Sequence, residues 1–455
     1  MSRLIPRWLN LKNELFASTF SYGATAVIKL ISSLILTRML SPETYGIFGI
    51  LLAFLFAIEM LSDVGMGAFL IRHPRGNDIR FVHTLWTIKL IRAVVNCCLL
   101  CLVAPLISRF YHSPVLTPAL RTLSVQFLIA GVESMAYVLA MRDQKARIIN
   151  YAELISNAVM AVTVIGLASV LRNHFALIYG VLLQRALMAI GSHFFYRNIG
   201  VGIAFDREAI VDQFRFARYV TPSSLVTLVL SQWDKIILLR LTSMGLLGVY
   251  TIASNIVAPL TGMIIHNARA ILYARCAAYF RADIATARSR YYAENKRLFT
   301  VGIMPPAIIA GLSQFLIALL YDPRYMQAGH ILMILGLGTI VAAAYNASES
   351  LLFASGRTYV VLAGNVVRLV SLIPASLAGY YFFGFAGFLW CNLLAALLPL
   401  AYFYLEQWQR NLWQPRSELG WLAASFAVFL VCLAASHVLL AVVPADWLHL
   451  HLRRH

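Results

Sequence analysis

The sequence has little charge and no polar segment long enough to fold as a separate soluble domain. Only 12% of its 455 residues are charged and 60% are apolar, which differs strongly from a soluble globular protein. Acidic residues are especially few, with 19 Asp and Glu against 37 Lys and Arg. An active site in an aqueous domain is therefore not expected, and the apolar segments must carry the function.

Cysteine is scarce, and its six copies form neither a disulfide framework nor a metal-binding pattern. Cys97, Cys98, Cys101, Cys391 and Cys432 lie inside apolar stretches, at spacings that suit neither zinc nor paired disulfides. We interpret them as small apolar packing residues. Neither a metal nor a cofactor is expected.

A cleavable signal peptide is not expected. Residues 1–12 are basic, but the apolar run that follows is too long for a signal peptide and has no cleavage site of small residues. The first apolar run is therefore interpreted as a signal anchor that remains part of the protein.

The chain consists mainly of thirteen apolar stretches, each about as long as a helix that crosses a bilayer. Because backbone groups in lipid must hydrogen-bond within the protein, these stretches are expected to be helices. The expected fold is an all-α polytopic membrane bundle. The stretches are Leu15–Leu40, Tyr45–Ile71, Phe81–Tyr111, Leu116–Met141, Tyr151–Leu171, Phe175–Tyr196, Phe216–Leu241, Leu246–Tyr273, Leu298–Tyr321, Ala328–Phe353, Tyr359–Phe383, Phe385–Leu405 and Leu419–Val443.

The net charge of +18 could indicate nucleic-acid binding, but its distribution indicates a membrane protein. With the N-terminus placed in the cytoplasm, most Lys and Arg residues fall in the loops expected to be inside, as the positive-inside rule requires. Basic loops also lie favourably against an anionic cytoplasmic leaflet. The sequence therefore predicts a multi-pass membrane protein with a cytoplasmic N-terminus and no nucleic-acid partner.

An internal repeat divides the chain. A shift of 202 residues places Ile35–Ile50 on Ile237–Ile252, and six of the sixteen positions are identical. An even number of spans separates the two copies, so we expect two six-helix lobes related by a pseudo-two-fold axis along the membrane normal. The expected parts are an N-terminal lobe (1–196), a cytoplasmic amphipathic linker (197–215), a C-terminal lobe (216–406), and an extra C-terminal span with its tail (407–455). Within the linker, Asp206–Phe214 is expected to form a helix on the membrane surface.

Several ionisable residues lie deep inside the apolar stretches, where each costs several kcal/mol. Lys29, Arg185 and Arg368 are candidates to bind an anionic ligand such as a pyrophosphate. The alternative is that they form internal salt bridges with acids of the bundle. Those acids are Glu133, Asp234 and Glu349.

Glu59 and Asp63 are spaced i, i+4 and are expected to share one helix face. That face could hold a proton or a sodium ion, or each acid could pair with a neighbouring cation. Together with Glu133, Asp234 and Glu349 they are the candidates for ion coupling. The cations Lys89, Arg92 and Arg269 lie nearer to helix ends and are expected to extend toward a membrane surface.

Five segments resemble a known family. LTRMLSPETYGIFGI followed by LSDVGMGAFLIR, and then WDKIILLRLTSMGLLGVYTIASNI, are similar to segments of the bacterial polysaccharide exporters, including the O-antigen flippases. These belong to the multidrug/oligosaccharidyl-lipid/polysaccharide exporter superfamily. FDREAIVDQFRFARYVTP and YDPRYMQAGHILMILGLG also resemble family segments. Ala274 departs from the family, in which a proline is expected.

The resemblance implies a transporter that moves an undecaprenyl-diphosphate-linked oligosaccharide from the cytoplasmic to the outer leaflet by alternating access, without chemical conversion. It implies a role in the biosynthesis and export of a polysaccharide, such as an exopolysaccharide or the O-antigen of lipopolysaccharide. It also implies that the protein acts together with a polysaccharide polymerase and with export machinery. By position, it assigns binding of the diphosphate-sugar head group to Lys29, Lys235 and Arg368.

Three alternatives are open. A cation-coupled multidrug exporter would have the same fold, but its binding residues would be acidic and aromatic, whereas deep cations here at least equal deep acids. A membrane enzyme such as a glycan polymerase would need a catalytic loop outside the membrane, and the outside loops are short. A scaffold that transports nothing is the third alternative.

Overall fold

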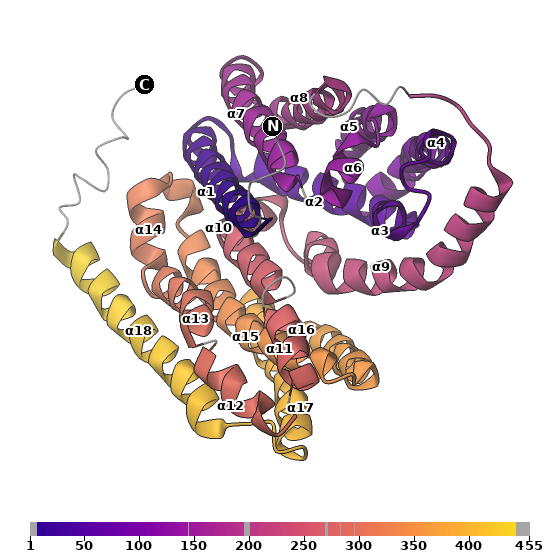
Figure 1. Ribbon diagram of the computed structural model, residues 1–455. Helices are drawn as coiled ribbons and strands as arrows, with labels where there is room; N and C mark the ends of the chain where they lie inside the picture. The colour runs from indigo at the N-terminus through magenta and orange to yellow at the C-terminus, as the bar shows by residue number, and fades with distance from the viewer. Residues whose placement is uncertain are drawn as a thin grey trace. The chain divides into compact units, whose positions relative to one another are not determined.

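The computed structural model describes residues 7–143, 145–194, 201–268, 272–282, 284–294 and 296–442. Within these ranges every regular element is a helix (Figure 1). The expected all-α polytopic membrane bundle is therefore confirmed. The chain divides into two compact units, Met1–Gly248 and Val249–His455.

The first unit contains nine helices of the described chain and the first turn of a tenth. Among them, α4 packs along α5, and α7 packs against both α1 and α8. The helices are α1 (Arg7–Met39), α2 (Pro42–Leu61), α3 (Met66–Arg72), α4 (Ile79–Phe110), α5 (Leu116–Val132), α6 (Ala136–Arg142), α7 (Ala146–Leu171), α8 (His174–Phe194), α9 (Arg207–Leu241) and α10 (Met244–Asn267).

The second unit contains the rest of α10 and the helices that follow it. Here α13 packs against α15 and along α18, the last helix of the described chain (Figure 1). The helices are α11 (Tyr273–Ala282), α12 (Ile284–Glu294), α13 (Lys296–Gly311), α14 (Ser313–Leu320), the 3-10 helix η2 (Pro323–Tyr325), α15 (Ala328–Ala354), α16 (Thr358–Ala395), α17 (Leu397–Trp408) and α18 (Pro415–Val442).

Eight helices of the described chain are long and apolar enough to cross a membrane, or up to ten if each of two bent pairs counts as one span. The expected stretches Tyr359–Phe383 and Phe385–Leu405 fall on α16 and α17. The helix α16 is kinked at Gly384, where φ is 64° and ψ is −153°. The helices α1 and α9 lie outside the set of eight to ten. The number of thirteen spans stays a prediction.

Three stretches expected as single helices are broken helix pairs. Tyr45–Ile71 is divided into α2 and α3 by residues 62–65, where Gly65 adopts a left-handed φ of 65°. Leu116–Met141 is divided into α5 and α6, which meet at 58°, and Leu298–Tyr321 into α13 and α14, which meet at 64°. Each break frees backbone groups that side chains must satisfy, because lipid offers no hydrogen bonds.

The sequence predicts a short surface helix at Asp206–Phe214, but this segment is the first part of the long helix α9. Asp206 caps the N-terminus of α9 by accepting hydrogen bonds from the backbone N–H groups of Glu208 and Ala209, and the helix then continues without interruption to Leu241. Gln213 is fully buried and donates a hydrogen bond of 2.6 Å to the backbone carbonyl of Val64. The start of α9 is thus attached to the α2–α3 break.

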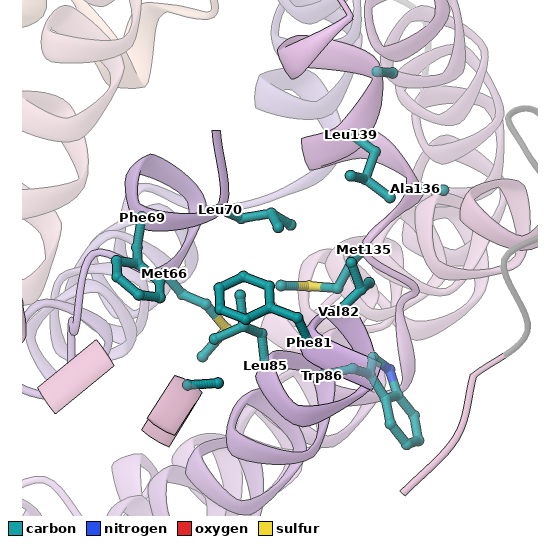
Figure 2. Packing of buried hydrophobic residues seen from close by; sticks show 12 residues of the cluster. Met66, Phe69, Leu70, Phe81, Val82, Leu85, Trp86, Met135, Ala136 and Leu139 are labelled. Atoms are coloured by element: carbon teal, nitrogen blue, oxygen red, sulfur yellow. The ribbon is translucent and has the colours of Figure 1, made fainter. Parts of the chain in front are cut away.

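A buried hydrophobic cluster holds these short helices together. It joins α3, α4, α6 and the start of α9, which contributes Ala209. Figure 2 shows the Phe81 ring surrounded by side chains that include Phe69, Leu70 and Met135. The cluster fixes the α2–α3 and α5–α6 breaks relative to α4, and both breaks carry charged residues.

The glycines of the internal repeat meet in the first unit. Gly46 and Gly248 are equivalent under the shift of 202 residues. A methyl group on Gly46 would lie 2.0 Å from the carbonyl oxygen of Met244, and one on Gly248 would lie 1.7 Å from the carbonyl oxygen of Pro42. Pro42 and Met244 are also equivalent under the shift, so the contact is reciprocal. The first turns of α2 and α10 approach this closely because both positions lack a side chain.

Replacing either glycine with alanine is expected to destabilise the protein. The added methyl group meets backbone, which cannot rotate away as a side chain can, so Gly46→Ala or Gly248→Ala should cost about 1–3 kcal/mol. Thermal unfolding of the purified protein measures the change. Gly166→Ala in α7 is the control, because nothing lies within 4 Å of its added methyl group. Equal midpoints for all three variants would contradict the close contact.

Candidate functional site

Asp63 organises the break between α2 and α3. Its carboxylate accepts hydrogen bonds from the backbone N–H of Gly65 (2.9 Å) and from the hydroxyl of Ser224 on α9 (2.8 Å). Its backbone carbonyl accepts a hydrogen bond of 2.8 Å from the Thr221 hydroxyl. The guanidinium of Arg92 lies 3.9 Å from the carboxylate. These contacts join three helices at one acid.

This geometry corrects the expectation that Glu59 and Asp63 share a helix face. The helix α2 ends at Leu61, so Asp63 lies in the break, where its direction is set by the turn before Gly65. Glu59 remains on α2, half-buried, and has no ion-pair partner in the part of the chain that the structure describes. The two acids therefore do not form one site on α2.

Glu133 is the centre of a second charged cluster, at the break between α5 and α6. One oxygen of its carboxylate, Oε2, lies 3.4 Å from Lys89 Nζ of α4 and 3.3 Å from Arg185 Nη2 of α8. Lys89 also donates a hydrogen bond of 2.9 Å to the backbone carbonyl of Glu133. The Glu133 side chain is 11% exposed. Two cations thus share one buried carboxylate.

Hydrogen bonds hold this break against α8. The backbone N–H of Ser134 donates to the Ser192 hydroxyl (2.9 Å), and the Ser134 hydroxyl donates to the Ser192 carbonyl (2.7 Å). The Tyr137 hydroxyl donates to the carbonyl of Met188 (3.1 Å). Because α8 also carries Arg185, these bonds fix the distance between Arg185 and Glu133.

The expectation that Lys89 and Arg92 extend toward a membrane surface is wrong. Both are ion-paired inside the first unit, Lys89 with Glu133 and Arg92 with Asp63. A long cationic side chain extends to a membrane surface to keep its charge solvated, but here the two helix breaks supply carboxylates and backbone carbonyls instead. Arg269, the third cation of that expectation, lies outside the described residues.

Arg368 lies over the ring of Tyr345 in the second unit. The Arg368 guanidinium carbon lies 5.4 Å from the centre of the Tyr345 ring, a cation–π distance. Glu349 and Arg368 both act electrostatically on the Tyr345 hydroxyl, which donates a hydrogen bond of 3.0 Å to Asn365 Oδ1. The Tyr345 ring stacks on Phe403, with centroids 4.9 Å apart. Glu349 is engaged in further contacts.

The remaining candidates lie apart from these clusters. Lys29 is exposed on α1, and Lys235 is half-buried on α9. Asp234 precedes Lys235, is also half-buried, and is engaged in further contacts. Of the residues selected from the sequence, the structure therefore pairs Arg185 with Glu133, whereas Arg368 and Glu349 share only the influence of both on Tyr345. Among the described residues, no group of three His, Cys, Asp or Glu side chains could hold a metal ion.

Sequence analysis did not identify Arg75, which forms a hub in the loop between α3 and α4. Its guanidinium pairs with Asp78 (2.9 Å), Asp206 (2.5 Å) and Glu208 (3.0 Å). Hydrogen bonds from Arg75 hold the pKa of Asp78 and of Asp206 below their ordinary value. The segment before α9 is thereby attached to α4, where the backbone N–H of Ala204 also donates to the Thr87 hydroxyl.

A buried acid of the second unit was also missed. The Tyr292 hydroxyl donates a hydrogen bond of 2.8 Å to Glu418 Oε1 at the start of α18 and accepts one of 3.1 Å from the backbone N–H of Gln414. Burial raises the pKa of Tyr292, which keeps its proton available for Glu418. Glu418 is 6% exposed and lies in the first turn of a helix, where a negative charge is favourable. We interpret this group as structural.

Comparison with known proteins places these features in context. The model of a family described as "Polysaccharide biosynthesis protein" matches residues 35–328, well over half of the chain. The lipopolysaccharide biosynthesis protein WzxC of Escherichia coli (strain K12) is 24% identical over 423 residues, which cover 88% of this chain and 84% of WzxC.

Two solved structures have a similar fold. A lipid II flippase, MurJ, in an inward closed conformation superimposes with a TM-score of 0.71 at 13% identity, over 96% of this chain and 95% of that chain. A multidrug resistance transporter of the MATE family in an inward-facing conformation superimposes with a TM-score of 0.64 at 13% identity, over 84% and 94%. At such low identity these similarities concern the fold alone.

The hydrogen bond between Ser224 and Asp63 is expected to stabilise the first unit. Ser224 is buried, so Ser224→Ala removes a hydrogen bond to a charged group and should lower the free energy of unfolding by about 1–3 kcal/mol. Ser231→Ala in the same helix is the control, since the Ser231 hydroxyl is exposed and bonds only within α9. A double-mutant cycle with Asp63→Asn measures the coupling. A coupling energy of zero would contradict the bond.

Proposed function

Because this chain belongs to the family of polysaccharide biosynthesis proteins, we propose that it is a flippase for a lipid-linked oligosaccharide. The proposed cargo is an undecaprenyl-diphosphate-linked oligosaccharide, which the protein moves from the cytoplasmic to the outer leaflet of the inner membrane by alternating access. The N-terminus is proposed to be cytoplasmic. The protein converts no substrate chemically. It delivers the translocated oligosaccharide to the polysaccharide polymerase and the export machinery.

The charge of the bundle supports an anionic cargo. Moving a diphosphate through hydrocarbon without help would cost tens of kcal/mol, and fixed cations can replace the lost hydration. In the Glu133 cluster two cations stand against one acid, and Lys29 and Lys235 add positive charge to the same unit. The membrane potential favours outward movement of an anion by roughly 2.3 kcal/mol per charge per 100 mV, so ion coupling is not required by energetics.

Specific roles follow for the charged residues. We assign contact with the diphosphate-sugar head group to Lys29, Lys235, Arg368 and Arg185. If protons or sodium ions drive the cycle, the acids that could bind them are Glu59, Asp63, Glu133, Asp234 and Glu349. Of these, Asp63 already accepts three hydrogen bonds through its carboxylate and carbonyl, and Glu59 is the acid without an ion-pair partner in the described chain.

One observation favours the alternative function, a cation-coupled multidrug exporter. Glu59 is a half-buried acid on α2 with no ion-pair partner among the described residues, and a cationic drug or a coupling ion could neutralise it. The similarity to a MATE transporter is compatible with this alternative at the level of the fold. Export of a cationic dye by cells that express the protein distinguishes the two functions, since the flippase function predicts none.

Deletion of the gene is expected to abolish one surface or secreted polysaccharide and to leave its lipid-linked repeat units in the cell. Loss of translocation, and not of synthesis, produces this combination. Mass spectrometry of extracted lipids and immunoblotting of surface glycan measure the two effects, and the wild-type gene should restore both. Normal surface glycan in a strain that lacks every related flippase gene would contradict the proposal.

Substitution of the proposed cations is expected to reproduce the deletion. Lys29→Ala and Arg368→Ala should be present in the membrane at normal levels but should export little glycan, because they remove charge without removing a buried ion pair. Arg324→Ala, which removes an exposed loop cation paired with Asp322, is the control and should export normally. Full export by both Lys29→Ala and Arg368→Ala would contradict their assigned role.

A further inference from the structure

The Glu133 cluster has more positive than negative charge. Lys89 and Arg185 approach the same oxygen, Glu133 Oε2, at 3.4 Å and 3.3 Å. The side chain of Lys89 is 17% exposed, that of Arg185 is 30% exposed, and that of Glu133 is 11% exposed. A cluster of net charge +1 in an apolar bundle is costly unless an anion completes it.

The two cations of the cluster are satisfied unequally. Lys89 has two acceptors, the carboxylate and the backbone carbonyl of Glu133. Arg185 has five N–H donors, yet its partner in the described chain is the single oxygen Oε2, and its Nε is buried with no hydrogen-bond acceptor. The missing acceptor is therefore at Arg185.

We propose that Glu133 is an internal placeholder for the diphosphate of the cargo, an inference that rests on the proposed function. Without cargo, Glu133 holds Arg185 in place through Oε2. When the diphosphate arrives, Arg185 exchanges Oε2 for phosphate oxygens, two of which can accept parallel hydrogen bonds from the planar guanidinium. Lys89 stays on Glu133 throughout.

The exchange is favourable because it leaves no buried charge without a partner. Lys89 and Glu133 remain as a neutral pair, anchored by the Glu133 carbonyl, while Arg185 pairs with the ligand. The bonds of Ser134 and Tyr137 to α8 keep the break and Arg185 within reach of one another during the exchange. Glu133 thus competes with the cargo, and its charge sets the affinity for the diphosphate.

The test measures binding of farnesyl diphosphate to the purified full-length protein in detergent. Farnesol, which has the same chain without phosphate, corrects for binding of the lipid tail, and inorganic pyrophosphate competes for the head-group site alone. Arg185→Gln removes the cation whose Nε has no hydrogen-bond acceptor. It should weaken farnesyl diphosphate binding by about tenfold, the loss expected for hydrogen bonds to a charged group. Removing the competing anion with Glu133→Gln should tighten binding severalfold.

Arg92→Gln is the matched control, because Arg92 lies on the same helix as Lys89 and is also paired with an acid at a helix break. It should leave the affinity unchanged. Tighter binding by Glu133→Gln cannot arise from misfolding, so this variant keeps the test decisive if Arg185→Gln folds poorly. The inference would be overturned if Glu133→Gln bound farnesyl diphosphate no more tightly than the wild type does. It would also be overturned if farnesol displaced farnesyl diphosphate as well as pyrophosphate does.

The outcomes separate this inference from the proposed function. If the wild-type protein binds farnesyl diphosphate and neither Arg185→Gln nor Glu133→Gln changes the affinity, the placeholder is wrong and the flippase function stands. If lipid-linked repeat units do not accumulate in the deletion strain, the flippase function itself is wrong, whatever the variants bind.

Discussion

The interaction on which this account depends is the sharing of one carboxylate oxygen by two cations. Charge is expensive in an apolar bundle, and Asp63 and Arg92 form a balanced pair there. The Glu133 cluster is different because Lys89 and Arg185 outnumber its single acid. Such an excess of positive charge inside a bundle is expected where the site binds an anion or faces water. A diphosphate-bearing lipid meets that need.

Broken helices explain where the charges are. A membrane helix that is interrupted leaves N–H and C=O groups without partners, and charged side chains are strong partners for them. Lys89 donates to the carbonyl at the α5–α6 break. Arg142 donates to the carbonyls of Leu70, Ile71 and His73 at the end of α3. The breaks therefore gather charge inside the bundle, and some of that charge is available for ligand binding.

The sequence predicts the helical architecture well because it depends on long apolar runs and on a local repeat. Gly46 and Gly248 could be paired in advance, and the structure brings their backbones together. The breaks were missed because a short polar turn such as residues 62–65 hardly changes the hydropathy of the surrounding run. The sequence left open that Arg185 pairs with Glu133 and Asp63 with a cation, and both pairs are present. Other ion pairs could not be predicted because they join distant segments: Arg75 and Asp206 are 131 positions apart, and Lys89 and Glu133 are 44 apart. Tertiary contacts, such as the packing in the cluster of Figure 2, set these distances.

The most direct test of the central claim, that an excess of buried positive charge receives an anionic lipid, is a translocation measurement. The purified protein is reconstituted in liposomes that contain a fluorescent prenyl diphosphate in one leaflet, and its movement is followed by quenching from outside. The account predicts that the protein accelerates transfer of the diphosphate over protein-free liposomes and leaves a prenyl alcohol with the same fluorophore unaffected. Equal rates for the diphosphate with and without protein, or acceleration of a cationic lipid instead, would contradict it.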